Sequence, residues 1–362
     1  MVNTNFWAGK RIFITGHTGF KGGWLSLWLA QMGGLVTGYS LEPNTKPNLF
    51  QVANIGDVLE KSYIADVRDI EQLSRAINTA SPEIIFHLAA QPLVRHSYAN
   101  PVETYATNVM GTVHLLECIR LQTTVRATVI VTSDKCYENK ERIWGYRENE
   151  ELGGFDPYSN SKGCAELVTS AYRQSFFNFK VTSSRHMGLA TARAGNVIGG
   201  GDWSHDRLIP DAIRSFDSNE LLLLRNPFAI RPWQHVLEPL SGYLVLAQSL
   251  YDKSPDYNGA WNFGPADQDA RSVREVVDLL ATGWTNNVSW KQNEEDQPHE
   301  AYMLKLDCSK ARHHLNWKPV WNLETAIEKI IYWQLAYKKK SNMHTTCLDQ
   351  INSYVSSLNA IL

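Results

Sequence analysis

The amino-acid sequence predicts an α/β protein with a doubly wound parallel sheet and a smaller, mixed α/β lobe in its C-terminal half. In the first half, apolar runs of strand length alternate with segments of helical period, which is typical of β-α-β units. A glycine-rich turn directly follows the first apolar run. After about Arg193 the pattern changes, because helices and short strands mix and Trp and Pro become frequent. This shift favours a second lobe.

Six runs have the length and composition of strands, at residues 11–14, 35–39, 62–64, 83–88, 127–132 and 187–192. Helical segments are expected at residues 24–32, 69–79, 101–121 and 157–177. We therefore expect residues 1–192 to form the sheet domain, with a later segment, about 235–263, returning to it. Residues 193–340 would form the second lobe, which begins near the loop Gly199–Gly201. Residues 341–362 are a C-terminal tail to which no element is assigned.

The composition is that of an enzyme acting on a small molecule. The 362 residues can bury a large core, and 35 basic against 37 acidic residues give a net charge of −2. Without a run of either charge, no nucleic-acid or membrane surface is predicted. Five scattered cysteines without a C-x-x-C pair indicate reduced thiols in a cytoplasmic protein. No metal site is visible, and the first apolar segment is too short to span a bilayer.

The glycine-rich turn Thr15–Gly22 lies between the first expected strand and the first expected helix. Glycines lack the Cβ atoms that would block a pyrophosphate, and the helix start offers unpaired N–H groups. The spacing of Gly16, Gly19 and Gly22 therefore predicts a dinucleotide site. Glu42 is the acidic residue nearest the end of the second strand, where no arginine favours a 2′-phosphate, so NAD is expected rather than NADP.

Tyr158 and Lys162 are four residues apart in an expected helix, which places them on one face. There the ammonium group would lower the pKa of the phenol from about 10 towards neutrality and make Tyr158 a general base. Ser133 and Asp134 follow the fifth expected strand. Ligands of open parallel sheets lie beyond the carboxyl ends of the strands, so these residues are expected to face the same cleft as the glycine turn.

These motifs, in this order, resemble those of the extended short-chain dehydrogenase/reductases that act on nucleotide sugars, over residues 9–335. The resemblance lies in the glycine turn, Asp66-Val67, Leu88-Ala89-Ala90-Gln91, Thr107-Asn108, Ser133-Asp134, Tyr158 with Lys162, and Arg193-Ala194-Gly195-Asn196. Within that group, further strings look like the CDP-glucose 4,6-dehydratases. These are His17 and Lys21 in the turn, Ser133-Asp134-Lys135, residues 194–203 with 207–210, and residues 231–236.

The resemblance implies a Rossmann fold and an NAD-dependent lyase that converts CDP-glucose to CDP-4-keto-6-deoxyglucose and water, for deoxysugar and O-antigen biosynthesis. In the implied cycle C4 is oxidised, water is eliminated across C5 and C6, and hydride returns to C6. Tyr158 would take the proton of the 4-hydroxyl, Ser133 would bond the 4-oxygen, and a protonated Asp134 would protonate the departing 6-hydroxyl. Lys135 would remove the C5 proton when neutral. Alternatively, it would stay charged in an ion pair with Asp134.

The resemblance also implies which residues bind the cofactor and the substrate. Those for NAD are Gly16, Thr18, Gly19, Phe20, Lys21, Gly22, Asp66, Val67, Leu88, Ala89, Ala90, Gln91, Thr107, Tyr158 and Lys162. Those for the nucleotide sugar are Asn196, Arg207, Arg231 and His299. The two arginines would grip the diphosphate, because guanidinium groups pair bidentately with phosphate oxygens.

Other functions stay open. The protein could be another nucleotide-sugar 4,6-dehydratase or a 4-epimerase. A 4-epimerase needs no acid at Asp134. A non-catalytic NAD-binding regulator would have no use for an intact set of Ser133, Tyr158 and Lys162. A structural or interaction protein is disfavoured by the many site motifs. The resembled group usually dimerises through the helices of residues 101–121 and Tyr158, so a homodimer or homotetramer is expected.

Overall fold

The computed structural model of the chain describes residues 2–178, 187–284, 288–295 and 301–360. Its centre is a seven-stranded parallel sheet in the order β10-β6-β5-β4-β1-β2-β3. The strands are β1 (Arg11–Thr15), β2 (Leu35–Ser40), β3 (Lys61–Ile64), β4 (Ile84–His87), β5 (Ala127–Val131), β6 (Gly188–Ala194) and β10 (Gly259–Phe263). The first six correspond to the six predicted strands. The predicted fold class is confirmed.

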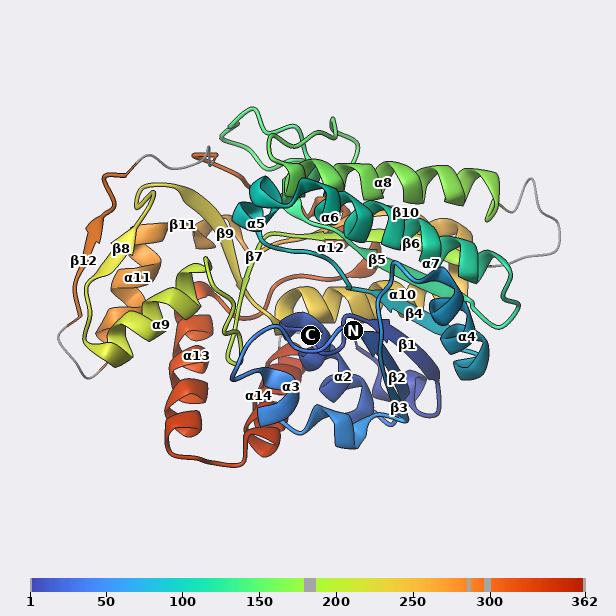
Figure 1. The fold of residues 1–362 in the computed structure, drawn as a ribbon, viewed down its shortest axis with the longest axis horizontal. Coiled ribbons are helices and arrows are strands. Elements are labelled where there is room, and N and C mark those ends of the chain that lie inside the picture. The colour runs from blue at the N-terminus through green and yellow to red at the C-terminus, as the bar shows by residue number, and fades with distance from the viewer. Residues whose placement is uncertain (1, 179–186, 285–287, 296–300, 361–362) are drawn as a thin grey trace.

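Helices cover both faces of this sheet because both faces of its strands are apolar (Figure 1). In β1, Ile12 and Ile14 pack with α2 (Phe20–Gln31), α10 (Leu237–Tyr257) and α14 (Met343–Ala360). Phe13 points the other way, into the core cluster that includes α4 (Ile70–Ala80) and α7 (Gly111–Arg120), and α8 (Pro157–Ser175) packs on the same side. This alternation is the period-2 pattern of a strand buried on both sides.

The second lobe carries two small sheets. One has the order β11-β9-β7, and the other pairs β12 with β8. Its strands are β7 (Asn196–Ile198), β8 (Leu222–Leu224), β9 (Ile230–His235), β11 (Ala270–Ser272) and β12 (Trp290–Gln292). The helices α9 (Leu208–Ser218), α11 (Val273–Thr282) and α13 (Leu323–Lys338) enclose a separate core there. Between β9 and β11 the chain forms α10 and β10, and β10 pairs with β6 of the large sheet.

The remaining elements are short. They are α1 (Thr4–Trp7), α3 (Leu49–Val52), η1 (Ile55–Val58), α5 (Val94–Ala99), η3 (Asp134–Cys136), η4 (Asp267–Asp269) and α12 (Ser309–Leu315). Within the described residues, no helix combines the length and the apolar character needed to cross a membrane.

The helix predicted over residues 101–121 is confirmed, with a π-helical turn in its middle that the sequence did not predict. The structure divides it into α6 (Pro101–Tyr105), a π-helical turn η2 (Ala106–Met110) and α7. Asn108 lies in this turn, where its Nδ2 atom donates to the carbonyl oxygen of Gln91 at 3.0 Å and to Ser161 Oγ at 2.8 Å. The turn thereby ties the loop after β4 to α8.

Helix α14 occupies most of the tail to which the sequence assigns no element. Cys347, Ile351 and Tyr354 form its buried stripe at helical spacing. The Tyr354 ring meets Trp28 of α2 edge to face at 5.6 Å and Trp321 at 5.0 Å. The helix is therefore part of the main core.

Candidate active site

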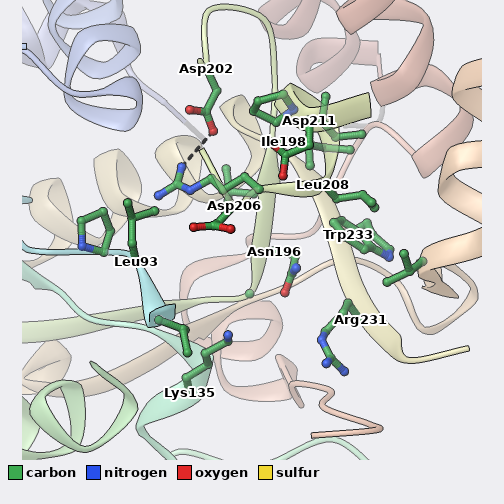
Figure 2. A pocket seen from close by; sticks show the side chains of 18 of the residues that line it. Leu93, Lys135, Asn196, Ile198, Asp202, Asp206, Leu208, Asp211, Arg231 and Trp233 are labelled. Carbon is green, nitrogen blue, oxygen red and sulfur yellow. Dashed lines mark hydrogen bonds and ion pairs between the residues drawn. The ribbon is translucent and has the colours of Figure 1, made fainter. Parts of the chain in front are cut away.

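A cavity of about 270 Å³ opens beyond the carboxyl end of β5, between the large sheet and the second lobe (Figure 2). It brings together eight of the predicted site residues from six separate segments. They are Lys21, Ser133, Asp134, Lys135, Tyr158, Asn196, Arg207 and Arg231. Hydrophobic side chains such as Leu93, Leu208 and Trp233 complete the wall. Polar groups thus converge in a largely preformed pocket, as in many substrate sites.

The turn after β5 holds Ser133 and Asp134 in a fixed relation. Ser133 accepts from the backbone N–H of Lys135 at 3.2 Å and donates to Asp134 Oδ1 at 3.0 Å. Asp134 is only 2 % exposed, and its Oδ2 atom has no hydrogen-bond partner among the described residues. Burial raises the pKa of Asp134 above its ordinary value, against the opposing charges of Lys135 and Arg231. The carboxyl group is therefore suited to hold and deliver a proton.

Lys135 extends into the cavity on the side where Asn196 and Arg231 lie (Figure 2). The sequence left open an ion pair between Lys135 and Asp134 that keeps the lysine charged. No hydrogen bond joins the two among the described residues, where Asp134 Oδ2 is unpartnered and Oδ1 accepts from Ser133, but the charge of Lys135 still lowers the pKa of Asp134. The Lys135 side chain is free to meet a substrate in the cavity.

Tyr158 is placed by the start of α8. Asp156 caps this helix by accepting from the N–H of Ser159 at 2.9 Å, and the Tyr158 N–H donates to Ser97 Oγ at 3.1 Å. Burial raises the pKa of Tyr158 to about 12, against a hydrogen-bonding interaction with Ser133. The expectation that the pKa of this phenol lies near neutrality is therefore wrong for the protein alone.

Lys162 accounts for part of that difference. Its Nζ atom donates to the carbonyl oxygen of Val131 at 3.2 Å, so this hydrogen bond goes to the end of β5 and not to the phenol. Burial lowers the pKa of Lys162 to about 8, while Glu166 acts in the opposite direction. The four-residue spacing predicts the shared helix face but not the burial that dominates both pKa values.

Cationic side chains besides Lys135 enter the same cavity. Arg207 pairs with Asp202 at 2.9 Å, and Arg231 donates to the carbonyl oxygen of Tyr302 at 3.2 Å. Lys21 also lines the cavity, and burial lowers its pKa to about 7, with Arg207 and Lys162 acting in the same direction. Positive charge so concentrated suits a phosphate-bearing ligand.

Some cavity residues were not singled out from the sequence. Asp202 is the partner of Arg207; the two residues lie in neighbouring strings of the resemblance, and their five-residue spacing is the signal that could have found the pair. Trp233 lies in the string of residues 231–236, whereas Leu93 comes from another segment and gave no such signal. His299, predicted to bind the substrate, lies outside the described residues.

The glycine turn has the geometry of a dinucleotide site. Gly16 adopts a φ of +82°, and a Cβ atom there would lie 2.7 Å from the N atom of Ala89. A Cβ atom on Gly22 would lie 2.1 Å from the Gly16 carbonyl oxygen, so the helix packs directly on the turn. Gly19 is the N-cap of α2 and supplies no side-chain cap. The first N–H groups of α2, from Phe20 onward, thus lack a capping side chain, which fits a bound pyrophosphate.

The other predicted cofactor residues follow β1, β3 or β4 or lie in η2, and several make bonds within the protein. Leu88 and Ala89 follow β4, and their N–H groups donate to Thr15. Thr18 donates to the carbonyl oxygen of Leu41 at 2.8 Å. The carboxylate of Asp66 accepts from Arg68, and Val67 lies in the core. Ala90 and Gln91 lie in the loop after β4, and Thr107 lies in η2.

Comparisons with known proteins agree with this geometry. A family model for GDP-mannose 4,6 dehydratase matches residues 13–330. The chain is 55% identical over 357 residues to CDP-glucose 4,6-dehydratase of Salmonella typhimurium, covering 99% of both chains. Among solved structures, UDP-glucose 4-epimerase with UDP-glucose from Thermotoga maritima matches with a TM-score of 0.76 at 20% identity, covering 90% of this chain and 99% of that one.

A second solved structure is dTDP-glucose 4,6-dehydratase from Bacillus anthracis in complex with NAD. It matches with a TM-score of 0.72 at 20% identity, covering 91% of this chain and 98% of that one. At 20% identity, these two solved structures show that the fold is alike. The Salmonella relative and the family model show that the sequence is alike as well, over nearly the entire chain.

Proposed function

Because the chain belongs to the GDP-mannose 4,6-dehydratase family, we propose that it is a CDP-glucose 4,6-dehydratase, an NAD-dependent lyase that forms CDP-4-keto-6-deoxyglucose and water. The relative at 55% identity supports the choice of CDP-glucose. The observation that carries the proposal is the meeting of Tyr158, Ser133 and a protonatable Asp134 in one cavity. A 4-epimerase needs a base and a bond to the 4-oxygen, but it does not need an acid for a leaving hydroxyl.

We assign NAD to the glycine turn and to residues 1–192, with residues 235–263 completing the same sheet, and the nucleotide sugar to residues 193–340. The uncapped start of α2 and the close packing at Gly16 and Gly22 support the cofactor assignment. When bound there, NAD would accept hydride from C4 of the sugar and return it to C6. Arg207, Arg231 and Lys21 would neutralise the diphosphate of CDP-glucose, which their shared cavity supports.

In the first step, Tyr158 accepts the proton of the 4-hydroxyl while Ser133 bonds the 4-oxygen. Since burial raises the pKa of Tyr158 to about 12, the phenolate has to be stabilised in the substrate complex, and Arg207 already acts in that direction. The resulting ketone acidifies the C5 proton. Lys135 accepts that proton, and Asp134 donates its own to the 6-hydroxyl, which departs as water. The proton held by Lys135 would then return to C5 as hydride returns to C6, which completes the 4-keto-6-deoxy product.

We further propose that the enzyme is a homodimer or a pair of dimers, joined through α6, η2 and α8. Val102 is 82% exposed, Met110 46% and Leu167 59%, and these elements contact one another on one side of the molecule (Figure 1). A second copy of the chain would cover these apolar side chains. All five cysteines are free, which supports a reducing compartment, the cytoplasm, as the place of the reaction.

A nucleotide panel tests the proposed activity. The purified protein with NAD is incubated separately with CDP-, dTDP-, UDP- and GDP-glucose, and the 4-keto product is measured. CDP-glucose is expected to react with the highest kcat/KM. A higher kcat/KM with another nucleotide would transfer the assignment to that substrate.

A further inference from the structure

The helix that carries Tyr158 and Lys162 carries a third residue on the same face. Glu166 follows Lys162 at the same four-residue spacing. Its side chain is only 3% exposed, and it lies beneath the cavity without forming part of the lining. None of the steps derived above uses Glu166.

The Glu166 carboxylate is fully bonded. Its Oε1 atom accepts from Thr132 Oγ1, and its Oε2 atom accepts from Thr191 Oγ1 at 2.6 Å and from Arg193 Nη2 at 2.8 Å. Arg193, also 3% exposed, donates through Nη1 to the Tyr137 hydroxyl at 2.7 Å. One carboxylate thus joins α8 to the ends of β5 and β6.

The hydrogen bonds of Glu166 reach the residue directly before Ser133, which takes part in the proposed reaction. Thr132 directly precedes Ser133, and the neighbouring Val131 carbonyl accepts from Lys162. Two successive residues at the end of β5 are therefore held by α8, one through Lys162 and one through Glu166. A change at Glu166 would release the turn that presents Ser133 to Tyr158.

Glu166 also balances the charge of Lys162. The groups that act on or are affected by this ammonium are Glu166 on its own helix, Cys136 of η3, His87 of β4 and Lys21 of α2. Burial raises the pKa of the Cys136 thiol and lowers the pKa of His87 to about 3, so both are neutral near pH 7. Glu166 is then the anion of this set.

A contribution to stability alone does not explain the buried ion pair of Glu166 and Arg193. A buried ion pair costs desolvation energy, and well-packed apolar residues often serve stability equally well or better. Two strand hydroxyls and a guanidinium converging on one carboxylate instead fix a specific geometry.

We propose that Glu166 is a positioning residue for the oxidation at C4: it holds Thr132 so that Ser133 faces Tyr158, and it places a negative charge one helical turn from Lys162. This inference rests on the proposed function, since the oxidation is the first step of that reaction. It adds to the proposed catalytic set a residue that does not touch the substrate.

The test compares E166Q with wild type and with T169V. Thr169 is buried one turn along α8, and its hydroxyl donates only locally, to the Ala165 carbonyl at 2.7 Å. Each NAD-loaded protein is mixed with CDP-glucose, and the absorbance of reduced nicotinamide is followed across a pH series, together with KM, kcat and thermal unfolding.

E166Q should oxidise CDP-glucose about 10 to 100-fold more slowly, with KM changed less than about twofold, because positioning acts on the proton transfer more than on binding. The loss of rate at alkaline pH should begin about one pH unit lower, since Lys162 loses its counter-charge. T169V should match wild type in both respects. An E166Q protein whose rate and pH profile equal those of wild type overturns the proposal, as does one that only melts earlier with an unchanged profile.

A second variant decides the matter if E166Q does not fold. T132V removes one hydrogen bond and leaves the pair of Glu166 and Arg193 in place. A slower oxidation with unchanged KM supports the proposal, and a wild-type rate contradicts it. A wild-type protein that does not oxidise CDP-glucose overturns the proposed function, and this inference falls with it.

Discussion

The hydroxyl group of Ser133 donates to Oδ1 of Asp134 at 3.0 Å, while the other carboxyl oxygen of Asp134 has no partner within the described part of the chain. The serine thus orients the carboxyl group, and burial raises its pKa. The free oxygen lies beside Gly195, where an added Cβ atom would come within 3.0 Å of it. This arrangement suits an acid that protonates a leaving hydroxyl after oxidation.

The first prediction concerns the separation of oxidation from elimination. Asp134→Asn should still oxidise C4 but fail to expel the 6-hydroxyl, because the amide cannot supply the proton. Reduced nicotinamide should therefore accumulate after CDP-glucose is added, while overall turnover falls by about 10² to 10⁴. Asp206→Asn is the control, since Asp206 also lines the cavity but pairs with Arg95 at 3.1 Å. Loss of both signals in Asp134→Asn would place this residue in the oxidation step or in folding.

The second prediction concerns the general base. Tyr158→Phe should lower kcat by about 10² to 10⁴, because the phenol oxygen that accepts the 4-hydroxyl proton is gone. NAD affinity, measured by titration calorimetry, should change little, since the glycine turn is untouched. Wild-type turnover in this variant would mean that the base is another group.

The third prediction separates two roles of Lys135. As a base it must be neutral when it accepts the C5 proton, so Lys135→Met and Lys135→Arg should both abolish turnover. Solvent deuterium exchange at C5 of the trapped ketone should then slow sharply. Arginine keeps the charge but cannot deprotonate in a protein. Substantial turnover by Lys135→Arg would show that the residue serves as a counter-ion.

The fourth prediction concerns stability and pH. Glu238 of α10 accepts from the N–H groups of Val320 and Trp321 and from the Tyr354 hydroxyl. Burial raises its pKa from 4.5 to about 7. Because the folded state holds this proton more tightly, the free energy of unfolding should fall as pH rises from about 4.5 through 7.

The loss assigned to Glu238 corresponds to about 3 kcal/mol at pH 8. Denaturant unfolding at pH 5 and pH 8 should show a smaller difference for Glu238→Gln than for wild type, because the amide does not titrate. An equal difference in the two proteins would remove Glu238 as the cause.

Six strands of the large sheet could be predicted from sequence because most of them are apolar runs between turn signals, whereas β10 was expected only as part of a segment returning to the sheet. The site could be predicted in outline because polar residues follow β5 and recur with fixed spacing in α8. Local sequence cannot supply the partners of Asn108, which lie in other segments and accompany the π-helical turn in the expected helix. The same holds for α14, whose buried stripe is completed by Trp28 and Trp321.

The pKa of Tyr158 shows most clearly what cannot be predicted from the sequence. The spacing to Lys162 gives a shared face, but the pKa depends on how deeply the tertiary fold buries the phenol and on which acceptor the ammonium meets. These are consequences of packing that no local pattern contains.

The most direct test of the central claim follows one atom through the reaction. The protein is incubated with NAD and CDP-glucose deuterated at C4, and the product is examined by NMR. A 4,6-dehydratase transfers the hydride from C4 to C6, so we predict a 4-keto product that carries deuterium in its 6-methyl group. A product that keeps its 6-hydroxyl and carries deuterium at C4, as expected of a 4-epimerase, would contradict the account.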